Sequence, residues 1–223
     1  MRTVILDLDG TLADTSADLL AAANAQFVKR GLGGPLDPQA DKLTAFHGGR
    51  AMLRLGYERL GLAPDTDTAD RDYHALLADY AEGIDRETRL YPGAAEAIET
   101  LRSQGFAVGI CTNKPVDLAE TLIRKLGVRD LFASLVGAGS FPVRKPDPLP
   151  YVASVEQAGG SVARSLLVGD TETDRLTARA AEVPAVLVTF GPEGRGIDRL
   201  QAEAYLESYA DLADIAIGLL GRD

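Results

Sequence analysis

The chain has 223 residues, of which 46% are hydrophobic and 25% are charged, which is the composition of an ordinary globular protein with a sizeable core. Its formal net charge of -10 argues against nucleic acid as a partner, because binding to the phosphate backbone needs a basic face. A lone cysteine, Cys111, excludes an intramolecular disulfide and a cysteine-based metal cage, and the apolar run around it predicts a core position. No apolar stretch is long enough for a membrane span, and Asp7 interrupts the first one before it reaches signal-peptide length, so we expect a cytoplasmic protein without a membrane partner.

The first predicted element is a buried strand that ends in two carboxylates. Residues 4–11 read Val-Ile-Leu-Asp-Leu-Asp-Gly-Thr, and the lack of polar alternation is typical of a central strand in a parallel sheet. Successive strand side chains alternate between faces, so Asp7 and Asp9 can point the same way, while Gly10 lets the backbone turn sharply. Two buried acids without compensation are costly, so this pair predicts a bound cation.

The next part of the chain, from Ser16 to about Glu87, is predicted to be helical throughout. A helix begins near Ser16 and is stopped by Gly31, and a loop rich in glycine and proline follows. Two further helical patterns cover about residues 50–60 and 70–84, and no strand pattern is present.

From Tyr91 onward, predicted helices and strands alternate. Pro92 and Gly93 open a helix that runs to Ser103. Later strands are predicted at 106–111, 134–137, 165–168 and 185–189, and later helices at 116–126, 148–158, 173–181 and 211–220. This alternation predicts an α/β fold with a doubly wound parallel sheet, which binds ligands at the carboxyl ends of its strands. The helical segment interrupts the sheet after its first strand, so we predict a core of residues 1–15 and 88–223 with residues 16–87 inserted as an all-helical domain.

Three more polar clusters follow predicted strands at the same edge of the sheet. They are Thr112-Asn113-Lys114, then Lys145-Pro146, then Gly169-Asp170 with Asp174 nearby. Each cluster alone is compatible with a helix cap or a surface loop. Four such clusters at four successive positions of one sheet edge favour a common functional site.

These four segments resemble the four motifs of the haloacid dehalogenase-like superfamily. The matching residues are Asp7-Leu8-Asp9-Gly10-Thr11, Thr112-Asn113, Lys145-Pro146, and Gly169-Asp170 with Asp174. The resemblance covers nearly the whole chain, and the inserted helical segment is similar to the type 1 cap domain of the superfamily. Within the superfamily, the chain looks most like the phosphoglycolate phosphatase-like group.

The resemblance implies a Mg²⁺-dependent phosphatase that hydrolyses a small phosphorylated metabolite through an aspartyl-phosphate, with phosphoglycolate as the candidate substrate. Asp7 would be the nucleophile, Asp9 the general acid and base, and Lys145 the cation that neutralises the nucleophile and the phosphoryl oxygens. The implied Mg²⁺ ligands are Asp7, the backbone carbonyl of Asp9, and Asp170. The implied phosphate-binding residues are Gly10, Thr112, Asn113 and Lys145, with Thr11 and Asp174 as supporting residues behind them.

Substrate choice is expected to depend on the helical domain. Its loop at residues 46–50 contains two glycines and ends in Arg50, which we predict to pair with a carboxylate or a second phosphate of the substrate. Alternatives on the same core are a phosphomutase similar to β-phosphoglucomutase, a nucleotidase or a pyrophosphatase. A catalytically silent binding module is the non-enzymatic alternative, although every motif position holds a chemically competent residue.

Two further expectations concern assembly and one helix end. No segment specifies an interface, so we expect a monomer or a weak homodimer. The superfamily commonly has a glycine after the helix that follows Asp174, but here Ala181 is followed by Glu182. Glu182 is therefore predicted either to adopt a left-handed conformation or to belong to a helix that ends differently.

Overall fold

A computed structural model describes residues 1–221 of the chain as two compact units. One unit comprises Met1–Ala13 and the described residues from Leu90 onward, and the other comprises Asp14–Arg89. The second unit therefore extends two residues beyond each end of the predicted insertion, 16–87. None of the described helices is both long enough and apolar enough to span a membrane.

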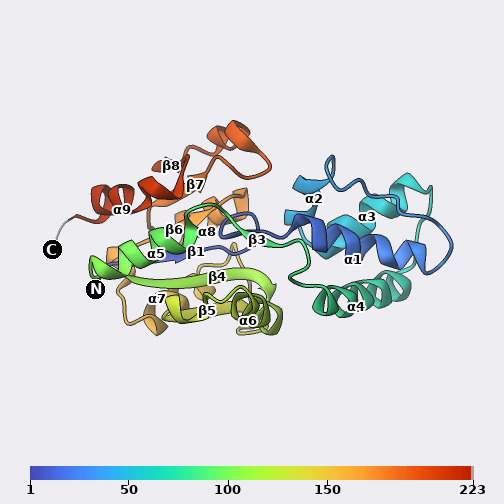
Figure 1. Cartoon of the computed structure of the whole chain (residues 1–223), viewed down its shortest axis with the longest axis horizontal. Coiled ribbons are helices and arrows are strands. Elements are labelled where there is room, and N and C mark those ends of the chain that lie inside the picture. Colours follow the sequence, from blue (N-terminus) through green and yellow to red (C-terminus); the bar gives the residue numbers. More distant parts are fainter. Residues whose placement is uncertain (222–223) are drawn as a thin grey trace. The chain divides into compact units, whose positions relative to one another are not determined.

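The first unit is built on a six-stranded parallel sheet with the strand order β5-β4-β1-β6-β7-β8 (Figure 1). The strands are β1 (Thr3–Leu6), β4 (Ala107–Pro115), β5 (Ser134–Ala138), β6 (Ser165–Gly169), β7 (Ala185–Val188) and β8 (Ala204–Leu206). Strand β1 is central, with Leu6 opposite Ile110 of β4 and Val168 of β6. The chain builds outward on one side of β1 and then on the other, so the predicted α/β fold is confirmed and the ligand-binding crevice is expected at the carboxyl end of β1.

Helices surround this sheet and bury its side chains. They are α5 (Ala94–Ser103), α6 (Val116–Lys125), α7 (Leu149–Gln157), α8 (Glu172–Ala180) and α9 (Leu212–Leu220), with short 3₁₀ turns at Arg129–Leu131, Val162–Arg164, Gly194–Leu200 and Tyr209–Asp211. One core cluster joins Ile5 of β1 to Tyr151 of α7, and Cys111 of β4 lies in it fully buried. The prediction that Cys111 is a core residue is confirmed.

The second unit contains α1 (Ser16–Val28), α2 (Lys42–Phe46), α3 (Gly49–Arg59) and α4 (Thr66–Glu82). No strand occurs between residues 16 and 87, as predicted. Helix α4 begins four residues earlier than predicted, because Asp65 caps it by accepting a hydrogen bond of 2.7 Å from the backbone N–H of Thr68. Helix α2 was not predicted, since five residues are too few to show a helical period.

A two-stranded ribbon lies where the chain passes between the two units. Its strands, β2 (Ala13–Asp14) and β3 (Arg89–Leu90), are too short to be recognised from sequence. Next to the ribbon, the buried carboxylate of Asp18 accepts hydrogen bonds from the backbone N–H groups of Glu87 and Thr88 and from the Thr88 hydroxyl. The beginning and the end of the helical unit are thus tied together.

Two strands differ from the predicted pattern, and one helix end decides between the two predicted alternatives. Strand β4 continues beyond Cys111 to Pro115, with an irregular register against β5. Strand β8 is a short edge strand and was not predicted. Glu182 has φ of 57°, and the following N–H, of Val183, donates a hydrogen bond of 3.0 Å to the carbonyl of Ala178. The first of the two alternatives for this helix end is therefore the correct one.

Candidate active site

Asp7 continues directly from β1 and carries a buried carboxylate. Its backbone N–H donates a hydrogen bond of 2.9 Å to the carbonyl of Val168, which extends the pairing of β1 with β6. Oδ1 of Asp7 lies 3.1 Å from Nζ of Lys145 but is not aligned with any hydrogen-bond donor among the residues that the structure describes. A buried carboxylate oxygen that accepts no aligned hydrogen bond is unusual in a folded protein, and binding of a ligand is one physical reason for such an atom.

Lys145 places a positive charge between two carboxylates. Its ammonium lies 2.6 Å from Oδ1 of Asp174 and 3.1 Å from Oδ1 of Asp7, and its side chain is only 1% exposed. Burial alone would lower the pKa of Lys145, but the carboxylates of Asp174 and Asp7 outweigh it and raise that pKa. Lys145 is therefore a fixed cation beside Asp7 at any physiological pH.

Asp174 belongs to the N-terminus of α8 and holds Lys145 from there. Its Oδ2 accepts hydrogen bonds from the Thr171 hydroxyl at 2.7 Å and from the backbone N–H groups of Asp170 and Thr171. Thr171 and Asp174 together form the capping box of α8. One oxygen of Asp174 thus orders the turn after β6, and the other binds Lys145.

Asp170 follows β6 and lies against the loop that follows Asp7. Its Oδ1 accepts a hydrogen bond of 2.9 Å from the hydroxyl of Thr11. Gly10 has φ of +82°, and a Cβ atom at this position would lie 2.2 Å from Oδ2 of Asp170. Only glycine allows this approach, which brings Asp170 to the loop of Asp7 and Asp9. The carbonyl of Thr11 is held in turn by the hydroxyl of Tyr209 at 2.7 Å.

The buried acids fit a metal ion. Asp7, Asp170 and Asp174 each have a carboxylate oxygen, and these oxygens all lie within 4.8 Å of one another. Burial, reinforced by the neighbouring charges of Asp174 and Asp9, raises the pKa of Asp7 to about 6 against the opposing effect of Lys145. Burial raises the pKa of Asp170 as well. Because both oxygens of Asp174 already bind Lys145 and Thr171, Asp7 and Asp170 are the better ligands for a hard cation that prefers oxygen.

Asp9 pairs with a lysine that belongs to a predicted polar cluster but had no predicted role of its own. Nζ of Lys114, near the end of β4, lies 2.8 Å from Oδ1 of Asp9. The available signal was the position of Lys114 directly after Thr112-Asn113, but the strand was predicted to end at Cys111, so the direction of the Lys114 side chain was not predicted.

Thr112 and Asn113 form hydrogen bonds with the backbone of two neighbouring lysines, Lys114 and Lys145. The Thr112 hydroxyl accepts a hydrogen bond of 3.1 Å from the backbone N–H of Lys114. Nδ2 of Asn113 donates a hydrogen bond of 3.0 Å to the carbonyl of Lys145, and its Oδ1 is buried with no partner among the described residues. The amide of Asn113 therefore fixes the backbone at Lys145, in addition to any contact with a ligand.

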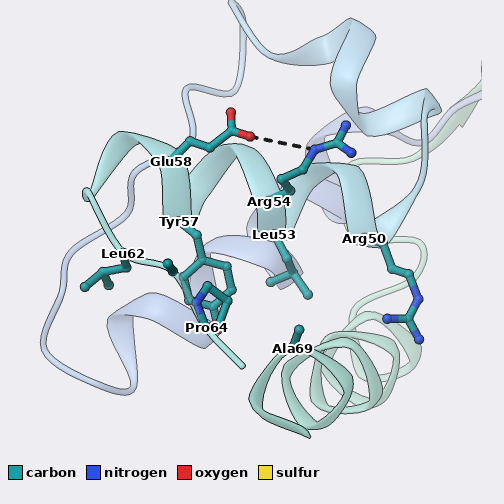
Figure 2. Close-up of a pocket in the computed structure, with 9 residues that line it drawn as sticks. Arg50, Leu53, Arg54, Tyr57, Glu58, Leu62, Pro64 and Ala69 are labelled. Atoms are coloured by element: carbon teal, nitrogen blue, oxygen red, sulfur yellow. Dashed lines mark ion pairs between the residues drawn. The ribbon is translucent and has the colours of Figure 1, made fainter. Parts of the chain in front are cut away.

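Arg50 lies in the helical unit, in the first turn of α3. Its guanidinium is 2.7 Å from Oδ1 of Asp70, and its central carbon is 4.4 Å from the centre of the Tyr73 ring. Arg50 also lines a cavity of about 380 Å³ between α3 and the start of α4 (Figure 2). The apolar side chains of Leu53, Tyr57, Leu62 and Pro64 form much of the wall of this cavity.

A sequence profile of the haloacid dehalogenase-like hydrolases matches residues 1–182. The chain belongs to the haloacid dehalogenase-like hydrolase family. The candidate site residues of the core, from Asp7 to Asp174, lie within the matched part of this haloacid dehalogenase-like hydrolase, whereas Tyr209 lies beyond it.

Individual relatives agree with this membership. The chain is 34% identical over 218 residues to a phosphoglycolate phosphatase of Caulobacter vibrioides, covering 98% of this chain and 92% of that protein. It is 35% identical over 206 residues to a phosphoglycolate phosphatase of Mesorhizobium japonicum, covering 92% and 90% of the two chains. Among solved structures, one described as a predicted phosphoglycolate phosphatase from Haemophilus somnus is similar with a TM-score of 0.85 and 23% identity over 96% of this chain and 97% of that one. At 23% identity, this structural similarity supports the fold of the hydrolase alone.

Proposed function

We propose that this haloacid dehalogenase-like hydrolase is a Mg²⁺-dependent phosphatase of small phosphorylated metabolites, with phosphoglycolate as the first candidate substrate. The observation that carries the proposal is the buried Oδ1 of Asp7, which has no aligned hydrogen-bond donor and lies 3.1 Å from Lys145. A carboxylate oxygen that accepts no aligned hydrogen bond and lies beside a fixed cation is suited to attack an anionic electrophile. The names of the relatives support the same class of reaction.

In the first half of the proposed reaction, an oxygen of Asp7 attacks the phosphorus atom. The bond from phosphorus to the ester oxygen breaks, and Asp9 gives a proton to the departing oxygen, which leaves as an alcohol. In the second half, water attacks the aspartyl-phosphate and gives a proton to Asp9, and the bond between Asp7 and phosphorus breaks. One phosphate monoester and one water thus yield one alcohol and one inorganic phosphate.

The negative charges of nucleophile and phosphate would repel each other without positive charge between them. Lys145 supplies one such charge at a fixed position, because Asp174 holds its ammonium from behind at 2.6 Å. When bound, Mg²⁺ would supply the rest of the charge neutralisation, held by Asp7, Asp170 and the backbone carbonyl of Asp9. Gly10, Thr112 and Asn113 are proposed to bind the transferring phosphoryl group, and Thr11 to orient Asp170 through its 2.9 Å hydrogen bond.

The helical unit is proposed to act as a cap domain that selects the substrate. Its chain enters and leaves through the short ribbon of β2 and β3, and it is compact by itself. We propose that Arg50 binds a carboxylate of the substrate, because its side chain is 59% exposed and its guanidinium is oriented by the ion pair with Asp70. A two-carbon phosphorylated acid has such a carboxylate.

The proposal is tested by phosphate release from phosphoglycolate, sugar phosphates, nucleoside monophosphates and pyrophosphate. Each substrate is measured with Mg²⁺, with EDTA and with the Asp7→Asn variant. We expect release that requires Mg²⁺, is abolished in Asp7→Asn, and is fastest with phosphoglycolate.

Other outcomes have distinct meanings. Fastest release from a nucleotide or from pyrophosphate would keep the mechanism and change the substrate. Transfer of phosphate to a second hydroxyl of the substrate without release would identify a phosphomutase. Folded, Mg²⁺-binding protein that acts on none of these compounds would contradict the proposed enzyme.

A further inference from the structure

We propose that Lys114 is a positioning residue, which holds the carboxyl group of Asp9 in the direction required for proton transfer at the ester oxygen. This inference rests on the proposed function and concerns a residue outside the four motif segments that carry the family resemblance. The contact that carries it is the 2.8 Å ion pair between Nζ of Lys114 and Oδ1 of Asp9.

The exposure of the two side chains shows which one a substrate can meet. The side chain of Lys114 is 3% exposed, whereas that of Asp9 is 18% exposed. The ammonium is thus buried behind the carboxylate, so a substrate at this edge of the sheet contacts Asp9. Lys114 acts on the reaction through Asp9 and not by direct contact.

The backbone of β4 fixes Lys114 at this place. The Thr112 hydroxyl accepts the hydrogen bond of the Lys114 N–H, and the register between β4 and β5 is irregular from Cys111 to Pro115. On the neighbouring strand, a Cβ atom at Gly137 would lie 2.8 Å from the Lys114 carbonyl and 2.7 Å from Cα of Val116. Strand β5 therefore needs glycine here, and the close strand packing restricts the position from which the Lys114 side chain extends.

The two buried lysines of the site have separate partners. Lys145 lies between Asp7 and Asp174, whereas Lys114 pairs with Asp9. Nucleophilic attack and proton transfer are thus served by different cations on different segments of the chain. Removal of Lys114 should impair proton transfer specifically, because a misplaced acid loses most of its effect.

The test compares substrates that differ in their need for a proton on the leaving oxygen. p-Nitrophenyl phosphate releases a stable phenolate and needs little acid assistance. Phosphoglycolate and an alkyl phosphate whose alkyl group carries no charge release poor leaving groups. kcat/KM is measured for these three substrates with wild type, Lys114→Met, Asp9→Asn and the double variant. Lys29→Met is the matched control, because Lys29 also pairs with an aspartate, Asp79, but in the helical unit.

We expect Lys114→Met to lower kcat/KM for both alkyl substrates about 100-fold more than for p-nitrophenyl phosphate, which is the lower end of the usual size of general acid catalysis. Asp9→Asn should show the same pattern, and the double variant should lose little more than Asp9→Asn alone. The ratio between substrates does not depend on the amount of folded enzyme, so it is informative even if Lys114→Met is less stable. Lys29→Met should leave the ratio unchanged.

Three results would overturn the inference. An equal loss with all three substrates would make Lys114 a structural residue only, while leaving the proposed phosphatase intact. A loss confined to phosphoglycolate would instead make Lys114 a direct ligand of the substrate carboxylate. If wild type hydrolyses neither these three substrates nor any of the sugar phosphates, nucleoside monophosphates and pyrophosphate, the proposed function itself fails, and the role of Lys114 with it.

Discussion

The hydroxyl of Thr11 donates a 2.9 Å hydrogen bond to Oδ1 of Asp170, a residue 159 positions later in the chain. This bond joins the loop after β1 to the loop after β6 and orients the Asp170 carboxylate. Residues that orient a metal ligand typically change metal affinity when they are removed.

Thr11→Val keeps the shape of the side chain and removes the donor. We expect its Mg²⁺ dissociation constant to rise about 10-fold or more, measured by calorimetric titration. Thr177→Val is the control, because Thr177 is equally buried and its hydroxyl donates a hydrogen bond to the carbonyl of Thr173 within α8. An unchanged Mg²⁺ affinity in Thr11→Val would show that Asp170 does not depend on this bond.

Asp7 is expected to lower the stability of the metal-free protein above pH 6. The pKa of Asp7 is about 6 in the folded state, whereas the ordinary value for an aspartate in an unfolded chain is 3.8. Between these pH values the folded protein binds more protons than the unfolded chain, so it loses stability as the pH rises. Asp7→Asn removes this dependence. With EDTA, the unfolding free energy of Asp7→Asn relative to wild type should increase by about 2 kcal/mol from pH 4.5 to pH 7.5, measured by urea denaturation. Parallel pH profiles for the two proteins would contradict this assignment.

Lys145→Met should impair both stability and activity. It leaves Asp7 and Asp174 buried without their shared cation, which costs about 3 kcal/mol in comparable cases. Phosphate release should fall by at least about 10³-fold, because the charge beside the nucleophile is lost. The double variant Lys145→Met with Asp7→Asn should regain part of the unfolding free energy but no activity. Equal unfolding free energies of the single and double variants would argue against a stabilising interaction between Lys145 and Asp7.

Gly10→Ala should abolish activity through the position of Asp170. The added Cβ would lie 2.2 Å from Oδ2 of Asp170, so the two loops must separate. Gly105→Ala is a matched control, because Gly105 has φ of +81° but no atom within 4 Å of the added Cβ. We expect the control to lose only about 1 kcal/mol of stability through backbone strain and to keep its activity. Similar activity of the two variants would exclude a requirement for the close approach at Gly10.

Arg50→Ala tests the role of the helical unit in substrate selection. If Arg50 binds the substrate carboxylate, KM for phosphoglycolate should rise about 10-fold or more with little change in kcat. Arg54→Ala is the control, since Arg54 lines the same cavity on the same helix and pairs only loosely, at 3.8 Å, with Glu58. Equal kinetics of wild type and Arg50→Ala would assign Arg50 to the ion pair with Asp70 alone.

The sequence was sufficient to predict those elements whose structure depends mainly on residues close to them in the chain. The buried strand before Asp7, the glycine at position 10 and the helical segment from Ser16 each follow from patterns of a few neighbouring residues. The same reasoning missed helix α2, the ribbon of β2 and β3, and the edge strand β8, because elements of two to five residues are stabilised by contacts with distant parts of the chain.

Hydrophobic periodicity decides which segments form strands, so the α/β fold could be predicted from the sequence alone, and so could the order in which Asp7, Thr112, Lys145 and Asp170 reach one edge of the sheet. The partners of these side chains could not be predicted and are visible only in the folded chain. It showed Asp174 bound to both Thr171 and Lys145, and Lys114 bound to Asp9 across 105 positions of the chain. Such pairings depend on strand register and on burial, and a shift of one residue in β4 would turn the Lys114 side chain to the opposite face.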